Sequence, residues 1–237
     1  MPSPSTPNRY AAFRRKLLAW FRTAGRDLPW RRTRDPYRVL VSEFMLQQTQ
    51  VSRVLDFYPG FLRRYPDLAA LARATPRAVR EAWDGLGYYR RAANLHRLAR
   101  QVVRHHEGRV PSDPAELERL PGVGPYTAGA VASFAFEKPA PAVDTNVSRV
   151  LRRVFGCGTA KQVRILAERL QPARGKTAWS FNQALMELGA LVCTARAPKC
   201  PGCPVRRSCR WYRSGRRRPR VRARSSASGP RSTARPG

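Results

Sequence analysis

The sequence predicts an all-α protein. Apolar residues recur at three- and four-residue steps from Tyr10 onward, beginning with Phe13, Leu17, Leu18 and Phe21, which is the spacing of one helix face. Proline, glycine and aspartate separate such segments, and no stretch alternates apolar and polar side chains as a half-buried strand does. Further helices are expected at approximately 36–48, 50–64, 75–83, 89–106, 125–136, 145–155, 162–171 and 178–192.

The two ends of the chain differ in composition from the rest. Residues 1–9 are rich in proline and serine, and residues 213–237 carry nine arginines and no acid among serine, glycine and proline. Such segments cannot bury enough apolar surface to fold, so we expect a flexible N-terminus and a disordered basic tail. Residues 10–212 are the expected folded region, and the length suits one compact fold or two small lobes.

The chain is strongly basic. It has 46 Lys+Arg against 15 Asp+Glu, a formal charge of +31, and +22 remains when the nine tail arginines are removed. This charge favours a polyanion such as nucleic acid, although a solvated arginine-rich surface that reflects codon usage is the alternative. No apolar run of about 18 residues and no leader-like segment occurs, so we expect no membrane span and a cytoplasmic protein, nucleoid-associated in a prokaryote.

Four of the five cysteines lie close together. Cys193, Cys200, Cys203 and Cys209 are spaced C-x6-C-x2-C-x5-C, and such a cluster in a reducing compartment favours metal or cluster ligation over disulfides. Structural zinc is the competitor, but four-cysteine zinc sites usually pair two CxxC knuckles and this loop has one. The spacing therefore favours an iron–sulfur cluster, held in a loop whose lysine and arginine side chains could face phosphates.

A glycine-containing turn lies between two of the expected helices. It consists of Leu120, Pro121, Gly122, Val123 and Gly124. Two glycines permit a tight turn, and its N–H groups and the following helix N-terminus can face a phosphate. We expect a helix-hairpin-helix element that binds the DNA backbone without reading sequence, although a lone GxG turn often only connects helices.

Two carboxylates are candidates for acid–base chemistry. Glu43 has apolar neighbours on a predicted helix, which would desolvate the carboxyl and raise its pKa. The alternative is an ordinary paired glutamate. Asp144 precedes the next helix, where capping of that helix is the first interpretation; capping and catalysis are compatible.

These strings together resemble the helix-hairpin-helix superfamily of DNA glycosylases that includes endonuclease III. The cysteine spacing, LPGVGPYTAGA (120–130) and SEFMLQQTQV (42–51) are similar to adenine glycosylase motifs, and the resemblance covers roughly 10–212. It implies a two-lobed fold with a [4Fe-4S] cluster, acting as a monomer on mismatched double-stranded DNA in base excision repair. By resemblance Glu43 protonates adenine N7, Asp144 stabilises or bonds C1′, and Tyr126 and Asn146 support this pair.

The same resemblance assigns residues to the flipped base. GLGYY (85–89) places Tyr88 as a wedge beside the orphaned guanine, assisted by Gln48. The residues expected around the adenine are Arg26, Trp30, Leu46 and Glu187. For Trp30 and Leu46 core packing is the alternative.

Some features of the sequence separate this chain from particular relatives, and others leave alternative functions open. Bifunctional enzymes of the endonuclease III type carry lysine where this hairpin has Tyr126, so we expect base removal without imine-based strand cleavage. The Nudix-like domain that usually follows in adenine glycosylases is missing from these 237 residues, which leaves the preference for 8-oxoguanine open. Residues 141–147 also resemble thymine/uracil mismatch glycosylases, and a non-catalytic DNA-binding module is a further alternative.

Overall fold

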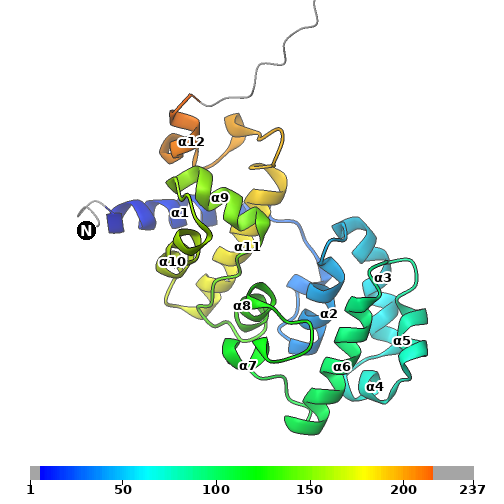
Figure 1. The fold of residues 1–237 in the computed structure, drawn as a ribbon. Coiled ribbons are helices and arrows are strands. Elements are labelled where there is room, and N and C mark those ends of the chain that lie inside the picture. The colour runs from blue at the N-terminus through cyan, green and yellow to red at the C-terminus, as the bar shows by residue number, and fades with distance from the viewer. Residues whose placement is uncertain (1–5, 216–237) are drawn as a thin grey trace, which may run out of the picture.

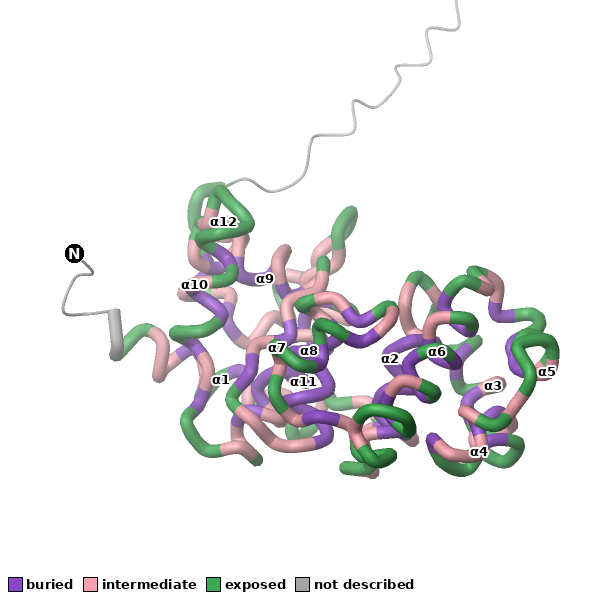
Figure 2. The backbone as a smooth tube through the Cα atoms, turned by 60° about the horizontal axis from the view of Figure 1, so that its bottom comes forward, coloured by how far each residue is buried: buried purple, intermediate pink, exposed green. Residues whose placement is uncertain are grey.

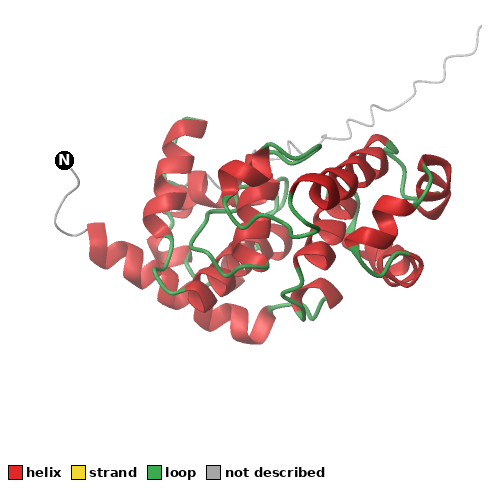
Figure 3. Ribbon diagram, turned by 90° about the horizontal axis from the view of Figure 1, so that it is seen from below, coloured by secondary structure: helices red, strands yellow, loops and turns green. Residues whose placement is uncertain are grey.

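The computed structural model describes residues 6–215, and within this range the backbone is helical without strands (Figure 3). The all-α prediction is confirmed. The α-helices in chain order are α1 (Thr6–Ala24), α2 (Pro36–Leu46), α3 (Val51–Arg64), α4 (Leu68–Arg73), α5 (Pro76–Ala82), α6 (Arg90–His105), α7 (Pro114–Glu118), α8 (Pro125–Phe134), α9 (Thr145–Phe155), α10 (Ala160–Leu170), α11 (Gly175–Leu191) and α12 (Arg210–Arg213). Short 3-10 turns are η1 (Pro29–Arg31), η2 (Cys200–Gly202) and η3 (Arg206–Ser208).

Two hydrophobic cores divide the fold into two lobes. The first core is built from η1 through α8, and the second from α1 and α9 through α12. Figure 1 shows α1 beside α9 and α11 although most of the chain separates them, and Figure 2 shows buried segments in both lobes. The two-lobed prediction is confirmed, and the chain enters the second lobe, crosses to the first and returns.

Several helix ends differ from their predicted positions because of local capping. Thr159 forms a capping box with Gln162, so α10 begins at Ala160, two residues before the expected start. Helix α2 ends at Leu46, two residues early, because Gln47 leaves the helical region with a ψ of 109°; Gln48 then takes a left-handed φ of 58°. Helices α4 and α7, of six and five residues, were not predicted because they are too short to show a helical period.

The N-terminal segment is more ordered than its composition predicts. Helix α1 begins at Thr6, inside the segment expected to be flexible. The Arg9 guanidinium donates to Val154 O at 3.1 Å and lies over the Phe155 ring, so contacts with α9 hold this turn. Most of the predicted tail, residues 216–237, lies outside the described range. No helix of the described residues is long and apolar enough to cross a membrane.

Helix α8 packs closely against the segment that leads to Asp144. A Cβ on Gly129 would lie 2.2 Å from Pro141 O, well inside van der Waals contact. We expect Gly129→Ala to destabilise the fold by about 2–3 kcal/mol, since backbone must move to accept it. Thermal denaturation checks this against Gly124→Ala, because Gly124 has open space and a φ of −102°. Equal melting temperatures for the two variants would contradict the close approach.

Candidate active site

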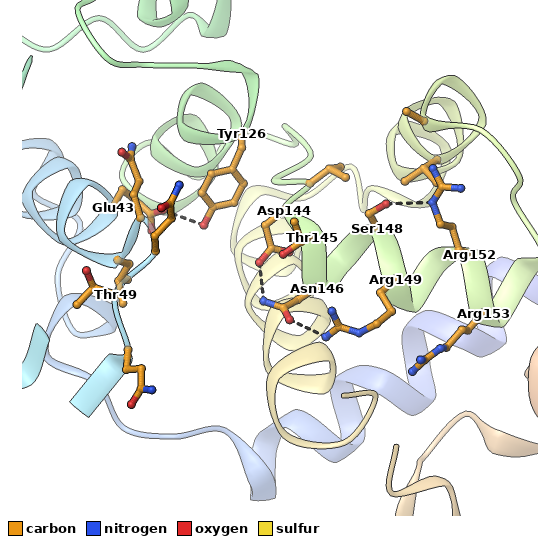
Figure 4. Close-up of a pocket in the computed structure, with 17 residues that line it drawn as sticks. Glu43, Thr49, Tyr126, Asp144, Thr145, Asn146, Ser148, Arg149, Arg152 and Arg153 are labelled. Atoms are coloured by element: carbon orange, nitrogen blue, oxygen red, sulfur yellow. Dashed lines mark hydrogen bonds between the residues drawn. The ribbon is translucent and has the colours of Figure 1, made fainter. Parts of the chain in front are cut away.

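A cleft of about 1360 Å³ lies where the two lobes meet. Its walls come from α2 and the following turn, from Tyr126 on α8, and from α9 with the segment before it (Figure 4). The lining residues include Glu43, Leu46, Gln48, Tyr126, Asp144, Asn146, Arg149, Arg152 and Arg153. Residues 43 and 144, far apart in sequence and on different lobes, therefore face one space.

Glu43 is a buried carboxyl at the wall of this cleft. Its residue is 3% exposed, and the Tyr126 hydroxyl donates to its Oε2 at 2.9 Å. Burial raises the pKa of Glu43 to about 7, the Asp144 charge adds to the rise, and Tyr126 and Arg31 oppose it. Because a carboxyl with a pKa near neutrality is partly protonated near neutral pH, Glu43 can donate a proton to a bound group.

Asp144 serves as a helix cap and also faces the cleft. Its Oδ1 accepts from Val147 N at 2.6 Å, which caps α9, and its Oδ2 accepts from Asn146 Nδ2 at 2.8 Å. The capping interpretation of Asp144 is confirmed, and its position at the cleft is compatible with the catalytic role, which stays a prediction. The side chain is fixed by two donors, and a fixed carboxylate can stabilise a developing cation without first reorganising.

The cap of α9 connects to the cysteine loop through one arginine. Arg149 Nη2 donates to Asn146 Oδ1 at 2.6 Å and to Gly189 O at 2.8 Å, and its Nε donates to Cys193 O at 2.7 Å. Arg153, one turn later, donates to Thr194 O at 2.7 Å. Helix α9 thus orients Asp144 at its start and holds the beginning of the cysteine loop along its length.

The predicted hairpin forms the turn between α7 and α8. Leu120 and Val123 are buried and anchor the turn in the first core. Gly122 takes a φ of 80°, and a Cβ there would lie 2.7 Å from the Asn94 side chain. Gly124 ends the turn at the N-cap of α8 with a φ of −102°, so only Gly122 of the two glycines takes left-handed backbone.

Comparison with known proteins identifies the family of this chain. Residues 41–173 match the HhH-GPD superfamily of base excision DNA repair proteins. The chain belongs to that superfamily. An adenine DNA glycosylase of Mycobacterium tuberculosis is 46% identical over 91% of this chain and 72% of its own length.

Solved structures with the same fold include two from other branches of the superfamily. A thermostable thymine-DNA glycosylase is similar with a TM-score of 0.83 and 34% identity, covering 89% of this chain and 99% of that one. A trapped endonuclease III–DNA covalent intermediate gives a TM-score of 0.76 and 27% identity, covering 92% and 100%. The second of these structures shows a protein of the same fold bound to DNA.

The structure brings some of the expected base-contacting residues of this HhH-GPD protein to the cleft and leaves others away from it. Leu46 and Gln48 line the cleft. Trp30 is 7% exposed in the first core, where its ring packs edge-on against Tyr58, so core packing describes it. Tyr88 is 61% exposed on a loop outside the cleft, and its entry into a duplex stays a prediction with which this exposure is compatible.

Glu187 holds two arginines and does not line the cleft. Its carboxylate is fully buried and accepts from Arg26 at 2.7 and 2.9 Å and from Arg31 at 2.8 Å. Burial alone would raise the pKa of Glu187, but these hydrogen bonds lower it to about 2. Glu187 thus belongs to a buried ion-pair network, and its contact with a base stays a prediction. Arg26 lines a separate depression with Phe21 and Trp179.

Sequence reasoning missed three arginines that organise the site of this HhH-GPD protein. Arg31 links Glu187 electrostatically to Glu43, Arg149 links Asn146 to the cysteine loop, and Arg91 lies buried beneath the turn after α2. In a chain with this many arginines, none of the three stands in a pattern that marks it. Only their burial and their partners distinguish them.

Proposed function

We propose that this protein is a monofunctional DNA glycosylase that removes adenine mispaired with guanine or 8-oxoguanine. One observation carries the proposal: a protonatable buried carboxyl, Glu43, lines the same cleft as a fixed carboxylate, Asp144. Cleavage of a glycosidic bond needs an acid for the leaving base and a negative charge for the sugar cation. The similarity to adenine DNA glycosylases supports adenine as the base.

The reaction follows from these two side chains. After extrusion of the nucleotide, Glu43 donates its proton to N7 of adenine, and the C1′–N9 bond breaks with its electron pair going to the base. The positive charge that develops on the sugar is stabilised by Asp144. Water then bonds to C1′, and the proton that it loses passes to the Glu43 carboxylate, which restores the acid. Tyr126 cannot form an imine with the sugar, so the DNA strand is left intact at an abasic site.

Thymine or uracil opposite guanine is the second candidate substrate. The similarity to a thymine-DNA glycosylase structure favours it. A pyrimidine has no N7, however, so the raised pKa of Glu43 would serve no comparable proton transfer. The buried acid therefore favours a purine leaving group.

The activity is tested by single-turnover assays on duplexes that carry adenine opposite 8-oxoguanine, guanine or cytosine, and thymine or uracil opposite guanine. We expect rapid release of adenine opposite the two purines, slow release opposite cytosine, and no trapping of protein on abasic DNA by borohydride. Fast thymine release without adenine release would replace the proposal with the second candidate. Borohydride trapping would show lyase chemistry instead.

We also propose a [4Fe-4S] cluster in the loop after α11. Cys193, Cys200, Cys203 and Cys209 all line one small apolar cavity, walled further by Val154, Leu188, Val192, Pro198, Val205, Trp211 and Tyr212. Among residues 6–215 no group of three or more His, Cys, Asp or Glu side chains is arranged to hold a single metal ion. Four thiols around an apolar cavity are the donor set of an iron–sulfur cluster, which when bound would cross-link this basic loop.

Loss of one ligand should remove the cluster and loosen the loop. We expect Cys203→Ser to lack the broad visible absorption of an iron–sulfur protein and to bind duplex DNA less tightly, because the loop is no longer cross-linked. Cys157→Ser is the matched control, since Cys157 does not line the cavity. Zinc in place of iron in the purified wild-type protein would contradict the assignment.

A further inference from the structure

Arg91, on the first turn of α6, is a buried guanidinium surrounded by backbone carbonyls. The residue is 7% exposed. Its Nη1 donates to Phe44 O at 3.1 Å, to Met45 O at 2.7 Å and to Gln47 O. Its Nη2 donates to Leu86 O at 3.2 Å and Gly87 O at 3.1 Å. One side chain therefore binds two backbone segments that are about forty residues apart in the sequence.

This cation has no acidic partner among the described residues. None of the ion pairs within residues 6–215 includes Arg91. The rings of Trp83 and Tyr88 lie 5.6 and 5.3 Å from its guanidinium carbon. A buried charge compensated only by carbonyls and ring faces is costly, so its placement points to a role that a smaller apolar side chain could not perform.

The two bound segments carry the two left-handed residues expected to enter the duplex. Gln48 follows Gln47 with a φ of 58°, and Tyr88 follows Gly87 with a φ of 48°. Both residues are exposed, while the backbone carbonyls of the residues before them accept hydrogen bonds from Arg91. Non-glycine residues persist at positive φ only where their surroundings hold them, and here one guanidinium holds both.

We propose that Arg91 is a positioning residue that fixes Gln48 and Tyr88 relative to each other, so that both enter the duplex together when the base is extruded. The inference rests on the proposed function, which requires the base to be extruded, and on the family resemblance, which implies that these two side chains take part. Arg91 itself does not line the cleft that holds Glu43 and Asp144. Its fork geometry is essential, since lysine presents one point of charge where arginine presents separate donors to the two segments.

The test separates extrusion from folding and from chemistry. Arg91→Lys keeps the charge and loses the fork, Arg91→Met keeps only the stem, and Arg104→Met removes an exposed charge from the far end of the same helix as control. Extrusion is followed by the fluorescence of 2-aminopurine placed opposite guanine. Binding is measured on a duplex with a tetrahydrofuran abasic analogue, which has no base to extrude, and folding by melting temperature.

We expect Arg91→Lys to reduce the extrusion signal at least fivefold and Arg91→Met at least tenfold. Binding of the abasic analogue should change less than threefold, and Arg104→Met should behave as wild type. In a chain that already carries Gln48→Ala and Tyr88→Ala, Arg91→Lys should change extrusion less than twofold, because its effect acts through those residues.

Three results would overturn the proposal. They are wild-type extrusion by the folded lysine variant, an equal further loss in the double-alanine background, or failure of both Arg91 variants to fold, which would make Arg91 a residue of general stability. Extrusion by wild-type protein without release of adenine would instead refute the proposed function and leave the role of Arg91 intact.

Discussion

Glu43→Gln should lower the single-turnover rate of adenine release by roughly 10³-fold while mismatched duplex is still bound. Glutamine keeps the size of the side chain, and its carbonyl oxygen can still accept the hydrogen bond from Tyr126. It cannot give up a proton to the leaving base. Glu81→Gln is the control, because Glu81 is exposed and pairs only with Arg77. Undiminished adenine release by Glu43→Gln would rule out Glu43 as the acid.

The wild-type rate should also depend on pH in a direction set by Glu43. Burial raises the pKa of this carboxyl to about 7, so the protonated, active form dominates below that pH and is lost above it. The rate of base release should therefore fall as pH rises through about 7. A profile that rises over the same range would indicate that Glu43 acts as a base.

The second large effect is expected at Asp144. Asp144→Asn should reduce base release by roughly 10²- to 10³-fold, since an uncharged amide cannot stabilise the sugar cation. Asparagine caps helices about as well as aspartate, so the cap of α9 should persist. One acceptor is lost, because Val147 N and Asn146 Nδ2 now share a single side-chain oxygen, and the cost should be about 1 kcal/mol.

Comparison of activity with stability identifies what Asp144 does. The measurements are the single-turnover rate and the melting temperature of Asp144→Asn. Asp113→Asn is the matched control, because Asp113 caps α7 and does not line the cleft. If Asp144→Asn lost activity only in proportion to a large loss of stability, capping alone would explain the residue and its proposed catalytic role would be wrong.

Much of the fold could be predicted from the sequence because its long helices carry their own signals. The 145–155 helix was predicted with its observed bounds, since an aspartate precedes it and a glycine follows the last apolar residue. Helices α4 and α7 could not be found, because one or two turns show no periodicity. Residues 6–9 are held by the hydrogen bond from Arg9 to Val154 O, and amino-acid composition does not predict such a contact.

At the site, short motifs identified the two candidate catalytic carboxylates but not which side chains pair with each other in the fold. The strings around Glu43 and Asp144 marked two carboxylates that line one cleft. Glu187 was assigned to the base by resemblance, yet its partners are Arg26 and Arg31, residues more than 150 positions away. Such pairings arise from the packing of the two lobes, and a one-dimensional pattern does not record which side chains then meet.

The central claim is that Glu43 protonates N7 of a mispaired adenine. It is tested most directly by single-turnover release from two duplexes that differ at one ring position, with adenine or 7-deazaadenine opposite guanine. The second base lacks the nitrogen that receives the proton and keeps the same pairing edge. We expect both duplexes to bind alike, with release of adenine and loss of at least roughly 10²-fold in the rate for 7-deazaadenine. Release of both bases at the same rate would contradict the mechanism.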